Sequence, residues 1–496
     1  MANVLVYAPF ATWQPHFETD LELGKKFADE EHQVSFYFCD GSLPTCAPNI
    51  SHSFLTCQMC KARSQQGIKW LNKTFDINVL PSFSLSKEEL IIINNMINKN
   101  FTTIEEVKSL EFEGCDIGMA ALSSVISYLR EPKPSLEKHQ DALKKNIQTA
   151  MTVYFSMKKT LTEGNFDRLI LFNGRFSALR PALRVARQMG IEVIVHERGT
   201  YLNEYSLTKN TYPHDINYIY QQLIDIKQNI PVDTYETVGG QWFEERISGQ
   251  QQNWKSFIEE QKAGKIPKEL QTDALKIAIF NSSEDEFEAI EEWKNPYYKT
   301  QNEGLVQILH DCQHLNVQFL LRVHPNLKGI DNSQTQELVN IKHKNKDLVF
   351  IDANSDISTY DLIKHVDLVI AFGSTVGIEA AYIGQPVCVM GKTPYDVLDA
   401  CIKPKSHQHL IKIITNLTQG IKPAITNNDS TVYGFWQKTK STPLIYTKQT
   451  DIFEAYLLES NEQVSLNRSP QHFIYYILQT SIVYIKKKLK CWIKLC

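Results

Sequence analysis

The sequence lacks an excess of charge of one sign. Its 52 lysine and arginine residues nearly balance 56 aspartate and glutamate residues, which leaves a formal net charge of −4. General nucleic-acid binding requires a strongly basic surface that attracts phosphates, so this balance argues against a nucleic-acid partner. We therefore expect a function that does not involve nucleic acid.

Long hydrophobic runs are also missing. Met1 to Asn3 lead directly into an apolar segment, without the basic start and long apolar stretch of a secretory signal. Near the other end, residues 472–485 are apolar but interrupted by polar side chains, and they are shorter than the roughly 20 residues that cross a bilayer. We expect a cytoplasmic protein, in which a reducing environment keeps most of the 10 cysteines as free thiols.

The chain has no G-x-G-x-x-G sequence after its first expected strand, Asn3 to Pro9, so NAD binding is not supported. Short-period repeats and low-complexity tracts are absent as well. A chain of 496 residues is too long for one ordinary hydrophobic core, and we therefore expect two domains.

What the sequence does contain is a compact series of elements around Gly373-Ser374-Thr375. The apolar run from Val366 to Phe372 predicts a buried parallel strand, which these small residues end. Val376 to Ile383 follow as a predicted helix, ended by Gly384, and Val387 to Met390 as the next strand. The pattern is therefore strand, small-residue loop, helix and strand.

The loop and the predicted helix offer groups that suit a nucleotide. Ser374 and Thr375 place two hydroxyls at a helix start, where free N–H groups and the helix dipole favour phosphate. Gly377 permits close approach of a ligand, and the carboxylate of Glu379 is placed to accept hydrogen bonds from ribose hydroxyls. The alternative is a plain α/β unit whose glycines serve packing only.

A second polar group follows another apolar strand. The run from Val317 ends in Arg322, His324 and Pro325, and the proline stops the strand and holds His324 extended. The carboxyl end of a parallel strand is where open α/β sheets bind ligands. A structural histidine is the alternative interpretation.

These motifs together resemble those of a known group of enzymes. Arg322-Val323-His324-Pro325 and Gly373-Ser374-Thr375 resemble the His-Pro and Ser-Ser/Thr motifs of bacterial sialyltransferases and capsule Kdo transferases. Segments of bacterial surface-polysaccharide biosynthesis proteins are similar to Ile279 to Phe287, Cys39 to Pro44 and Cys57 to Cys60. The resemblance covers about Val4 to Leu398 and implies a glycosyltransferase of the GT-B class, an α/β fold with two Rossmann-like domains facing a cleft.

The alternation of predicted strands and helices agrees with that fold class. We predict an acceptor-side domain over residues 1–270, which includes a cysteine-containing insertion and a helical linker. A nucleotide-sugar-binding domain is predicted over 271–440 and a helical tail over 441–496, in which Asp451 to Leu458 form a helix. Trp242 and Trp254 are expected to pack between layers of the linking helices.

In the first domain, polar residues again follow apolar strands. Arg175 and Arg198 are expected to hold anionic groups, with Asn173 beside them and His16 contacting sugar from the first strand-end loop. Glu197 is the candidate general base, because a transferase must take a proton from the acceptor hydroxyl. The resemblance places Glu197 at the acidic-acidic-Gly motif of the sialyltransferases, with Arg198 in place of the second acid. The alternative for Glu197 is a salt bridge with a neighbouring arginine.

The implied reaction moves a sugar from a nucleotide-sugar donor to a surface-polysaccharide or lipid-linked glycan acceptor, and the motifs favour a CMP-linked donor. His324 and Arg322 would neutralise the leaving group, and Glu197 and His324 would be catalytic. No cofactor and no metal are expected, because GT-B enzymes generally need no bound metal. The alternatives are a nucleotide-sugar 2-epimerase and a non-catalytic polysaccharide-binding accessory protein. The predicted donor-binding residues are Ser282, Ser283, Arg322, His324, Pro325, Gly373, Ser374, Thr375, Gly377 and Glu379.

Two further features remain open. Cys39, Cys46, Cys57 and Cys60 contain half of a zinc knuckle, so they are either zinc ligands or buried thiols. Residues 470–496 are aromatic and basic, which is typical of an interfacial helix on anionic lipid. We expect this tail to hold the protein peripherally on the inner face of the membrane, the alternative being a terminal helix docked on the protein.

Overall fold

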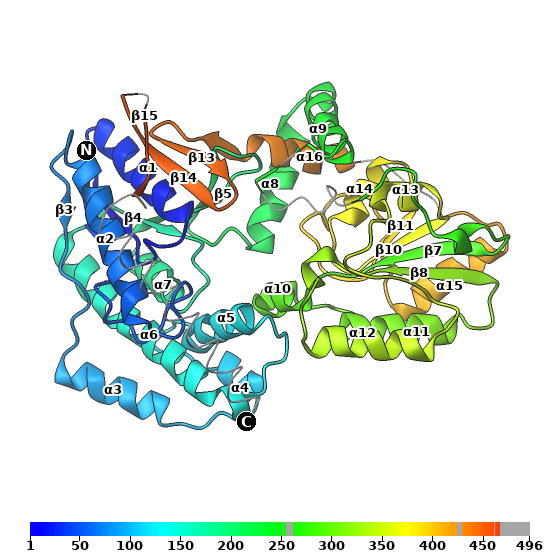
Figure 1. Cartoon of the computed structure of the whole chain (residues 1–496), viewed down its shortest axis with the longest axis horizontal. Helices are drawn as coiled ribbons and strands as arrows, with labels where there is room; N and C mark the ends of the chain where they lie inside the picture. Colours follow the sequence, from blue (N-terminus) through cyan, green and yellow to red (C-terminus); the bar gives the residue numbers. More distant parts are fainter. Residues whose placement is uncertain (251, 254–260, 424–428, 461, 467–496) are drawn as a thin grey trace, which may run out of the picture. The chain divides into compact units, whose positions relative to one another are not determined.

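The computed structural model describes residues 1–250, 252–253, 261–423, 429–460 and 462–466 (Figure 1). Trp254 and the 470–496 tail lie outside the described residues. The chain divides into two compact units, which we call the first and the second unit. The first unit comprises Met1–Tyr128, Ser135–Pro213 and the chain from Ser441, and the second comprises Leu129–Pro134 and His214–Lys440.

The first unit is built on a seven-stranded sheet of order β12-β6-β5-β4-β1-β2-β3. Its five strands from β5 to β3 run parallel; at one edge β6 pairs antiparallel with β5, and β12 pairs antiparallel with β6. The central strands are almost wholly apolar because helices cover both faces of the sheet. The strands are β1 (Asn3–Tyr7), β2 (Gln33–Tyr37), β3 (Asn78–Val79), β4 (Arg168–Phe172), β5 (Glu192–Arg198), β6 (Glu204–Lys209) and β12 (Ser441–Pro443).

In the described part of the chain, seven helices lie between β1 and β5 in the sequence. On one face, Phe17 and Leu21 of the first helix and Trp70 of the second pack with Val4 and Val6 of β1 in a single core. Ser86 and Thr103 begin two of the helices with capping boxes that satisfy free N–H groups. The helices are α1 (His16–Asp29), α2 (Phe54–Leu71), α3 (Lys87–Ile97), α4 (Ile104–Lys108), α5 (Ile117–Leu129), α6 (Leu136–Gly164) and α7 (Arg180–Gln188).

The predicted helix from Asp451 to Leu458 is wrong. The chain instead forms a three-stranded antiparallel sheet of β13 (Thr447–Asp451), β14 (Glu454–Glu459) and β15 (Glu462–Val464). Along β14 the side chains alternate, with Ala455 and Leu457 each 1% exposed, and Leu457 joins the core of the first unit. Alternating burial along the chain is typical of a strand and not of a helix. Residues 441–466 therefore belong to the first unit and do not form a separate helical tail.

The second unit contains a five-stranded parallel sheet of order β11-β10-β7-β8-β9. Helices α11 and α12 cover one face, and α13 and α14 lie on the other (Figure 1). The strands are β7 (Leu275–Phe280), β8 (Val317–Arg322), β9 (Val349–Ile351), β10 (Leu368–Ala371) and β11 (Val387–Val389). The helices are α10 (Glu284–Glu288), α11 (Gln301–Asp311), α12 (Ser333–Lys344), α13 (Thr359–Lys364), α14 (Val376–Tyr382) and α15 (His407–Thr418).

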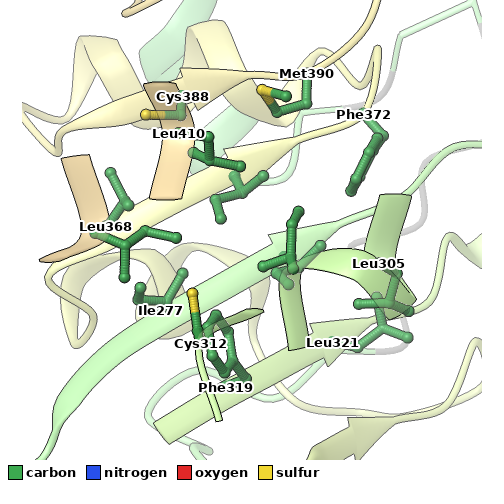
Figure 2. Packing of buried hydrophobic residues seen from close by; sticks show 14 of the residues in the cluster. Ile277, Leu305, Cys312, Phe319, Leu321, Leu368, Phe372, Cys388, Met390 and Leu410 are labelled. Carbon is green, nitrogen blue, oxygen red and sulfur yellow. The ribbon is translucent and has the colours of Figure 1, made fainter. Parts of the chain in front are cut away.

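The core of the second unit lies under the face that α11 and α12 cover. Figure 2 shows Ile277, Phe319 and Leu368 of the sheet beside Leu305 of α11 and Leu410 of α15. All five side chains are less than a tenth exposed, as expected for strands that read as continuous apolar runs. The predicted α/β class, with a parallel sheet in each part of the chain, is confirmed.

Three helices outside this sheet set the boundary of the second unit. They are α8 (Ile216–Asn229), α9 (Val232–Ile247) and α16 (Ser430–Thr439). Helices α9 and α16 cross so closely that a Cβ on Gly239 would lie 1.9 Å from the carbonyl oxygen of Thr431. Phe243 of α9 also stacks on Tyr382 of α14, with ring centroids 4.3 Å apart. Residues 214–270 therefore belong to the second unit, and the division falls after Pro213 instead of at the predicted position, residue 270.

Candidate functional site

The Gly373-Ser374-Thr375 loop joins β10 to α14, and the predicted strand, loop, helix and strand are all present. Gly373 has φ +76°, and a Cβ there would lie 2.6 Å from the ring of Phe287, so only glycine fits. The Oγ of Ser374 accepts a hydrogen bond from the N–H of Val376 at 3.3 Å, and its carbonyl accepts one from the Tyr395 hydroxyl at 2.6 Å. The loop is therefore held in one conformation at the carboxyl end of β10.

Gly377 and Glu379 on α14 are both engaged by neighbouring side chains. A Cβ on Gly377 would lie 2.5 Å from the Tyr395 hydroxyl, so the glycine makes room for that ring. The Glu379 carboxylate is 2% exposed and accepts hydrogen bonds from Arg246 Nη2 at 2.9 Å and from the Tyr360 hydroxyl at 2.7 Å. Sequence reasoning missed Arg246 and Tyr360, because no local pattern links α9 or α13 to α14.

The loop after β7 contacts the loop after β10. The hydroxyl of Ser282 donates to the carbonyl of Phe372 at 2.6 Å, and Gln301 accepts the Ser282 N–H at 2.8 Å. Ser283 is fully buried, and its hydroxyl donates to Asp285 Oδ1 at 2.5 Å. Ser282 thus fastens the neighbouring ends of β7 and β10 together, whereas Ser283 binds the acid at the start of α10.

Arg322 and His324 end β8 beside these loops. The Arg322 guanidinium is buried and donates to the carbonyls of Asp352 at 2.6 Å and Ser355 at 3.1 Å. Burial lowers the pKa of Arg322 to about 10. Its hydrogen bonds therefore hold the loop after β9, and its charge is directed at two carbonyl groups.

His324 is fixed by two hydrogen bonds, and Pro325 after it begins a short 3-10 turn. Its N–H donates to Asn281 Oδ1 at 2.8 Å, and its Nδ1 accepts the N–H of Asn326 at 3.1 Å. Burial, together with Arg322 and Arg130, lowers the pKa of the His324 imidazole to about 4. His324 is therefore neutral at pH 7, with its proton on Nε2, and can donate a hydrogen bond but no charge.

In the first unit, His16, Asn173 and Glu197 come together at the carboxyl ends of β1, β4 and β5. Asn173 Nδ2 donates to Glu197 Oε2 at 2.8 Å, and His16 Nδ1 lies 3.9 Å from Glu197 Oε1. The His16 ring stacks on Phe172 with centroids 3.7 Å apart. All three polar side chains are less than a tenth exposed, so this is a buried polar cluster of the kind found in active sites.

Two arginines and a second histidine adjoin this cluster. The guanidinium of Arg175 lies over the Phe176 ring at 4.5 Å, and that of Arg198 lies over the Phe453 ring at 5.4 Å. His196 Nε2 is hydrogen-bonded to Asp20 Oδ1 at 2.7 Å, a buried pair that sequence reasoning missed. Burial, with Arg198 and His196 nearby, holds the pKa of His16 well below its usual range, so His16 is neutral at pH 7.

The four cysteines of the insertion are free thiols. Burial raises the pKa of Cys60 to about 12 and also raises the pKa values of Cys39, Cys46 and Cys57, so these thiols stay protonated at neutral pH. Within the described part of the chain, no group of three or more His, Cys, Asp or Glu side chains is placed to hold a metal ion. In the same residues, no helix combines the length and the apolar character needed to cross a membrane.

A protein-family model matches a segment of the second unit. Residues 252–400 match the model of the family described as capsule polysaccharide biosynthesis protein, which confirms the predicted resemblance over this segment. It contains all five strands of the second sheet and every predicted donor-binding residue. No curated protein sequence matches the chain.

Several solved structures are similar to the chain. KpsC of Thermosulfurimonas dismutans, a β-Kdo 2,7-transferase, is 16% identical with a TM-score of 0.36, over 66% of this chain and 89% of that one. The β-Kdo 2,4-transferase of the same KpsC is 11% identical with a TM-score of 0.33, over 54% and 79%. The UDP-GlcNAc 2-epimerase of Methanocaldococcus jannaschii is 11% identical with a TM-score of 0.30, over 87% and 98%.

Proposed function

We propose that this chain is a GT-B glycosyltransferase, which moves a sugar from a nucleotide-sugar donor to a surface-polysaccharide or lipid-linked glycan acceptor. The family match over residues 252–400 supports a role in capsule polysaccharide biosynthesis. One observation supports the donor site: the loops after β7, β8 and β10 meet at the carboxyl edge of one parallel sheet. Ser282 is bonded to Phe372 and His324 to Asn281, so the three loops form one connected surface.

On the donor side, Ser374 and Thr375 bind the phosphate of the nucleotide, and His324 donates its Nε2 proton in a hydrogen bond to the leaving oxygen. Such a bond is strongest when charge develops on that oxygen, which lowers the barrier to departure. Glu379 is the ribose-binding carboxylate in this proposal. A carboxylate has about four acceptor positions, so it can take a ribose hydroxyl besides its bonds to Arg246 and Tyr360.

On the acceptor side, Glu197 takes the proton from the acceptor hydroxyl. The acceptor oxygen then forms a bond to the anomeric carbon while the bond from that carbon to the donor phosphate breaks. Asn173 fixes one carboxylate oxygen of Glu197, and the backbone N–H of Arg198 binds the other at 3.0 Å. His16, Arg175 and Arg198 contact the acceptor, with the two arginines holding its anionic groups. This reaction requires no metal and no cofactor.

The family match also supports a cytoplasmic location. A chain that builds capsule polysaccharide from nucleotide sugars works in the cytoplasm, where these donors are made. The aromatic and basic composition of residues 470–496 favours peripheral binding to the inner face of the membrane, beside a lipid-linked acceptor.

A thermal-shift panel of CMP, CDP, UDP and GDP tests this function. A ligand that binds the folded state raises the unfolding midpoint, and we expect CMP or CDP to do so, with cytidine as the control without phosphate. Stabilisation by UDP or GDP alone would reject the cytidine preference. No stabilisation by any nucleotide would reject the donor site.

The three candidate functions are distinguished by incubating the protein with sugar conjugates of the nucleotide that stabilises it. Transfer that depends on an added glycan acceptor supports the transferase. Interconversion of a nucleotide sugar without acceptor would instead show a 2-epimerase. Polysaccharide binding without either reaction would show an accessory protein.

A further inference from the structure

The short segment 129–134, which begins at the last residue of α5, is fastened to the donor-side loops of the second unit. Arg130 Nε lies 2.5 Å from Asp285 Oδ2, and its Nη2 donates to the Ser283 hydroxyl at 3.1 Å and to the Asn326 carbonyl at 3.4 Å. The carbonyl of Arg130 accepts a hydrogen bond from Asn332 Nδ2 at 2.6 Å. A guanidinium is thereby placed among the ends of β7 and β8, far from its position in the sequence.

The backbone of Arg130 is held in a conformation that its side chain does not favour. Its φ is +53°, in the left-handed region, which costs about 1 kcal/mol for a residue with a Cβ. Neighbouring Glu131 binds the N–H of Ser333 at 2.9 Å, so contacts on both residues secure the turn. The strained turn keeps the guanidinium directed at Ser283 and Asp285.

Arg130 has hydrogen-bonding capacity left over. A guanidinium carries five N–H donors, and the bonds above use Nε and Nη2 only. Among the described residues, no hydrogen bond from Nη1 of Arg130 is found, and the side chain is 35% exposed, so Nη1 can meet a ligand. Asp285, by contrast, is 3% exposed, and among the described residues its carboxylate is bonded to Arg130 and Ser283.

A second donor beside His324 lacks a partner. Asn281 is 4% exposed, and its Nδ2 has no hydrogen-bond partner in the part of the chain that the structure describes, while its Oδ1 binds the His324 N–H. A buried N–H without an acceptor costs about 1–3 kcal/mol. Arg130 Nη1 and Asn281 Nδ2 are both donors, and the ligand that suits two such donors is an anion rich in oxygen.

We propose that Arg130 and Asn281, beside His324, form an anion site that binds a phosphate oxygen of the donor nucleotide, with Arg130 supplying the positive charge. This inference rests on the proposed function and names the cation of its donor site. Arg322, the predicted cation, is bound to the carbonyls of Asp352 and Ser355, and His324 is neutral at pH 7. Arg130 is the guanidinium in this cluster that retains both charge and unused donors.

The competing explanation is that Arg130 only pairs with Asp285. A structural pair would change folding stability on substitution but would leave the affinity for phosphate unchanged. Measurement of anion affinity, separately from the unfolding midpoint, therefore distinguishes the two.

The experiment is isothermal titration of the full chain with pyrophosphate and with CDP. For Arg130→Gln we expect the Kd of both ligands to rise about tenfold or more, because a charge-assisted hydrogen bond is lost. Arg130→Lys, which keeps the charge without the fork, should give a smaller rise. The matched control is Lys227→Gln, since Lys227 is 38% exposed and lies 2.5 Å from Asp429 in an ion pair of the same unit. It should leave both Kd values within about twofold, as for surface pairs that touch no ligand.

A third variant guards against loss of folding. Arg130→Met with Asp285→Asn removes both charges, leaves no unpaired carboxylate and should still bind both ligands weakly. Affinity equal to wild type in Arg130→Gln or in this double variant would overturn the inference, as would failure of wild type to bind pyrophosphate. If CDP binds with the same Kd whether or not Arg130 is present, the inference is overturned but the proposed function is not. Pyrophosphate binding that depends on Arg130, without any sugar transfer, would support the inference and reject the proposed function.

Discussion

Glu22 on helix α1 binds the backbone of Thr447, although 425 residues separate them in the sequence. Its Oε2 accepts the Thr447 N–H at 2.7 Å and the Thr447 hydroxyl at 3.0 Å. The same carboxylate accepts the N–H groups of Ile445 at 2.7 Å and Tyr446 at 2.8 Å. One buried side chain therefore fastens the start of β13 to the first unit.

Replacement of Glu22 by alanine should loosen this attachment. Three backbone N–H groups would lose their acceptor, and we expect a loss of roughly 3 kcal/mol in the free energy of unfolding. Limited proteolysis within residues 441–466 should become faster, with Glu30→Ala as the control because Glu30 is half exposed at the end of the same helix. A Glu22→Ala variant as resistant as wild type would contradict the anchoring role.

Glu197→Gln tests the general base. The amide cannot take the acceptor proton, so we expect turnover to fall about 10²–10⁴-fold while nucleotide affinity stays unchanged. Glu192→Gln is the matched control on the same strand, since Glu192 pairs with Arg168 away from the cluster. If Glu197→Gln transferred sugar at the wild-type rate, Glu197 would not be the base.

The donor-side motifs are tested by His324→Ala and by the double variant Ser374→Ala/Thr375→Ala. Each removes side chains that would donate hydrogen bonds to the nucleotide phosphate, so nucleotide affinity should fall about tenfold or more. His365→Ala and Thr415→Ala serve as controls, because each side chain bonds to a backbone carbonyl four residues earlier, away from the predicted donor-binding residues. Wild-type affinity in both donor-side variants would show that the motifs do not form the site.

The buried carboxyl of Glu284 should make the stability of the folded protein depend on pH. Burial raises the pKa of its carboxyl to about 7, so the folded state holds a proton that the unfolded chain releases near pH 4.5. The protonated carboxyl contributes fully to the free energy of unfolding below about pH 4.5. This contribution, on the order of 3 kcal/mol, is lost as the pH rises through 7. Glu284→Gln should therefore raise the unfolding midpoint at pH 8 and change it little at pH 5. An equal effect at both values would contradict the shifted pKa.

The tail is tested by co-sedimentation with anionic vesicles. The full chain should bind and a truncation after Ser469 should not, because each lysine near such a surface contributes about 1 kcal/mol. Replacement of Lys486, Lys487 and Lys488 by glutamine should weaken binding, and raised salt should do the same. Equal binding by full-length and truncated protein, or none by either at low salt, would exclude this membrane role.

The sequence by itself determined the local elements and the loops between them. The apolar run before Gly373 and the run ending at Pro325 each gave a buried strand with a polar end, as the structure has it. Carboxyl ends of parallel strands share one edge, so the grouping of Ser282, His324 and Ser374 could be predicted without coordinates. Local periodicity with glycine and proline punctuation carries that information.

Only the tertiary structure decided which distant segments share a unit and what each charge faces. It assigned residues 214–270 to the second unit, in which a glycine contact holds α9 against α16, and it turned Asp451 to Leu458 into strands. It also placed Arg130 on Asp285, 155 residues away, and Arg246 on Glu379, 133 residues away. Such pairs arise because a buried charge must find a partner wherever the packed chain brings one, and the local sequence pattern does not record that partner.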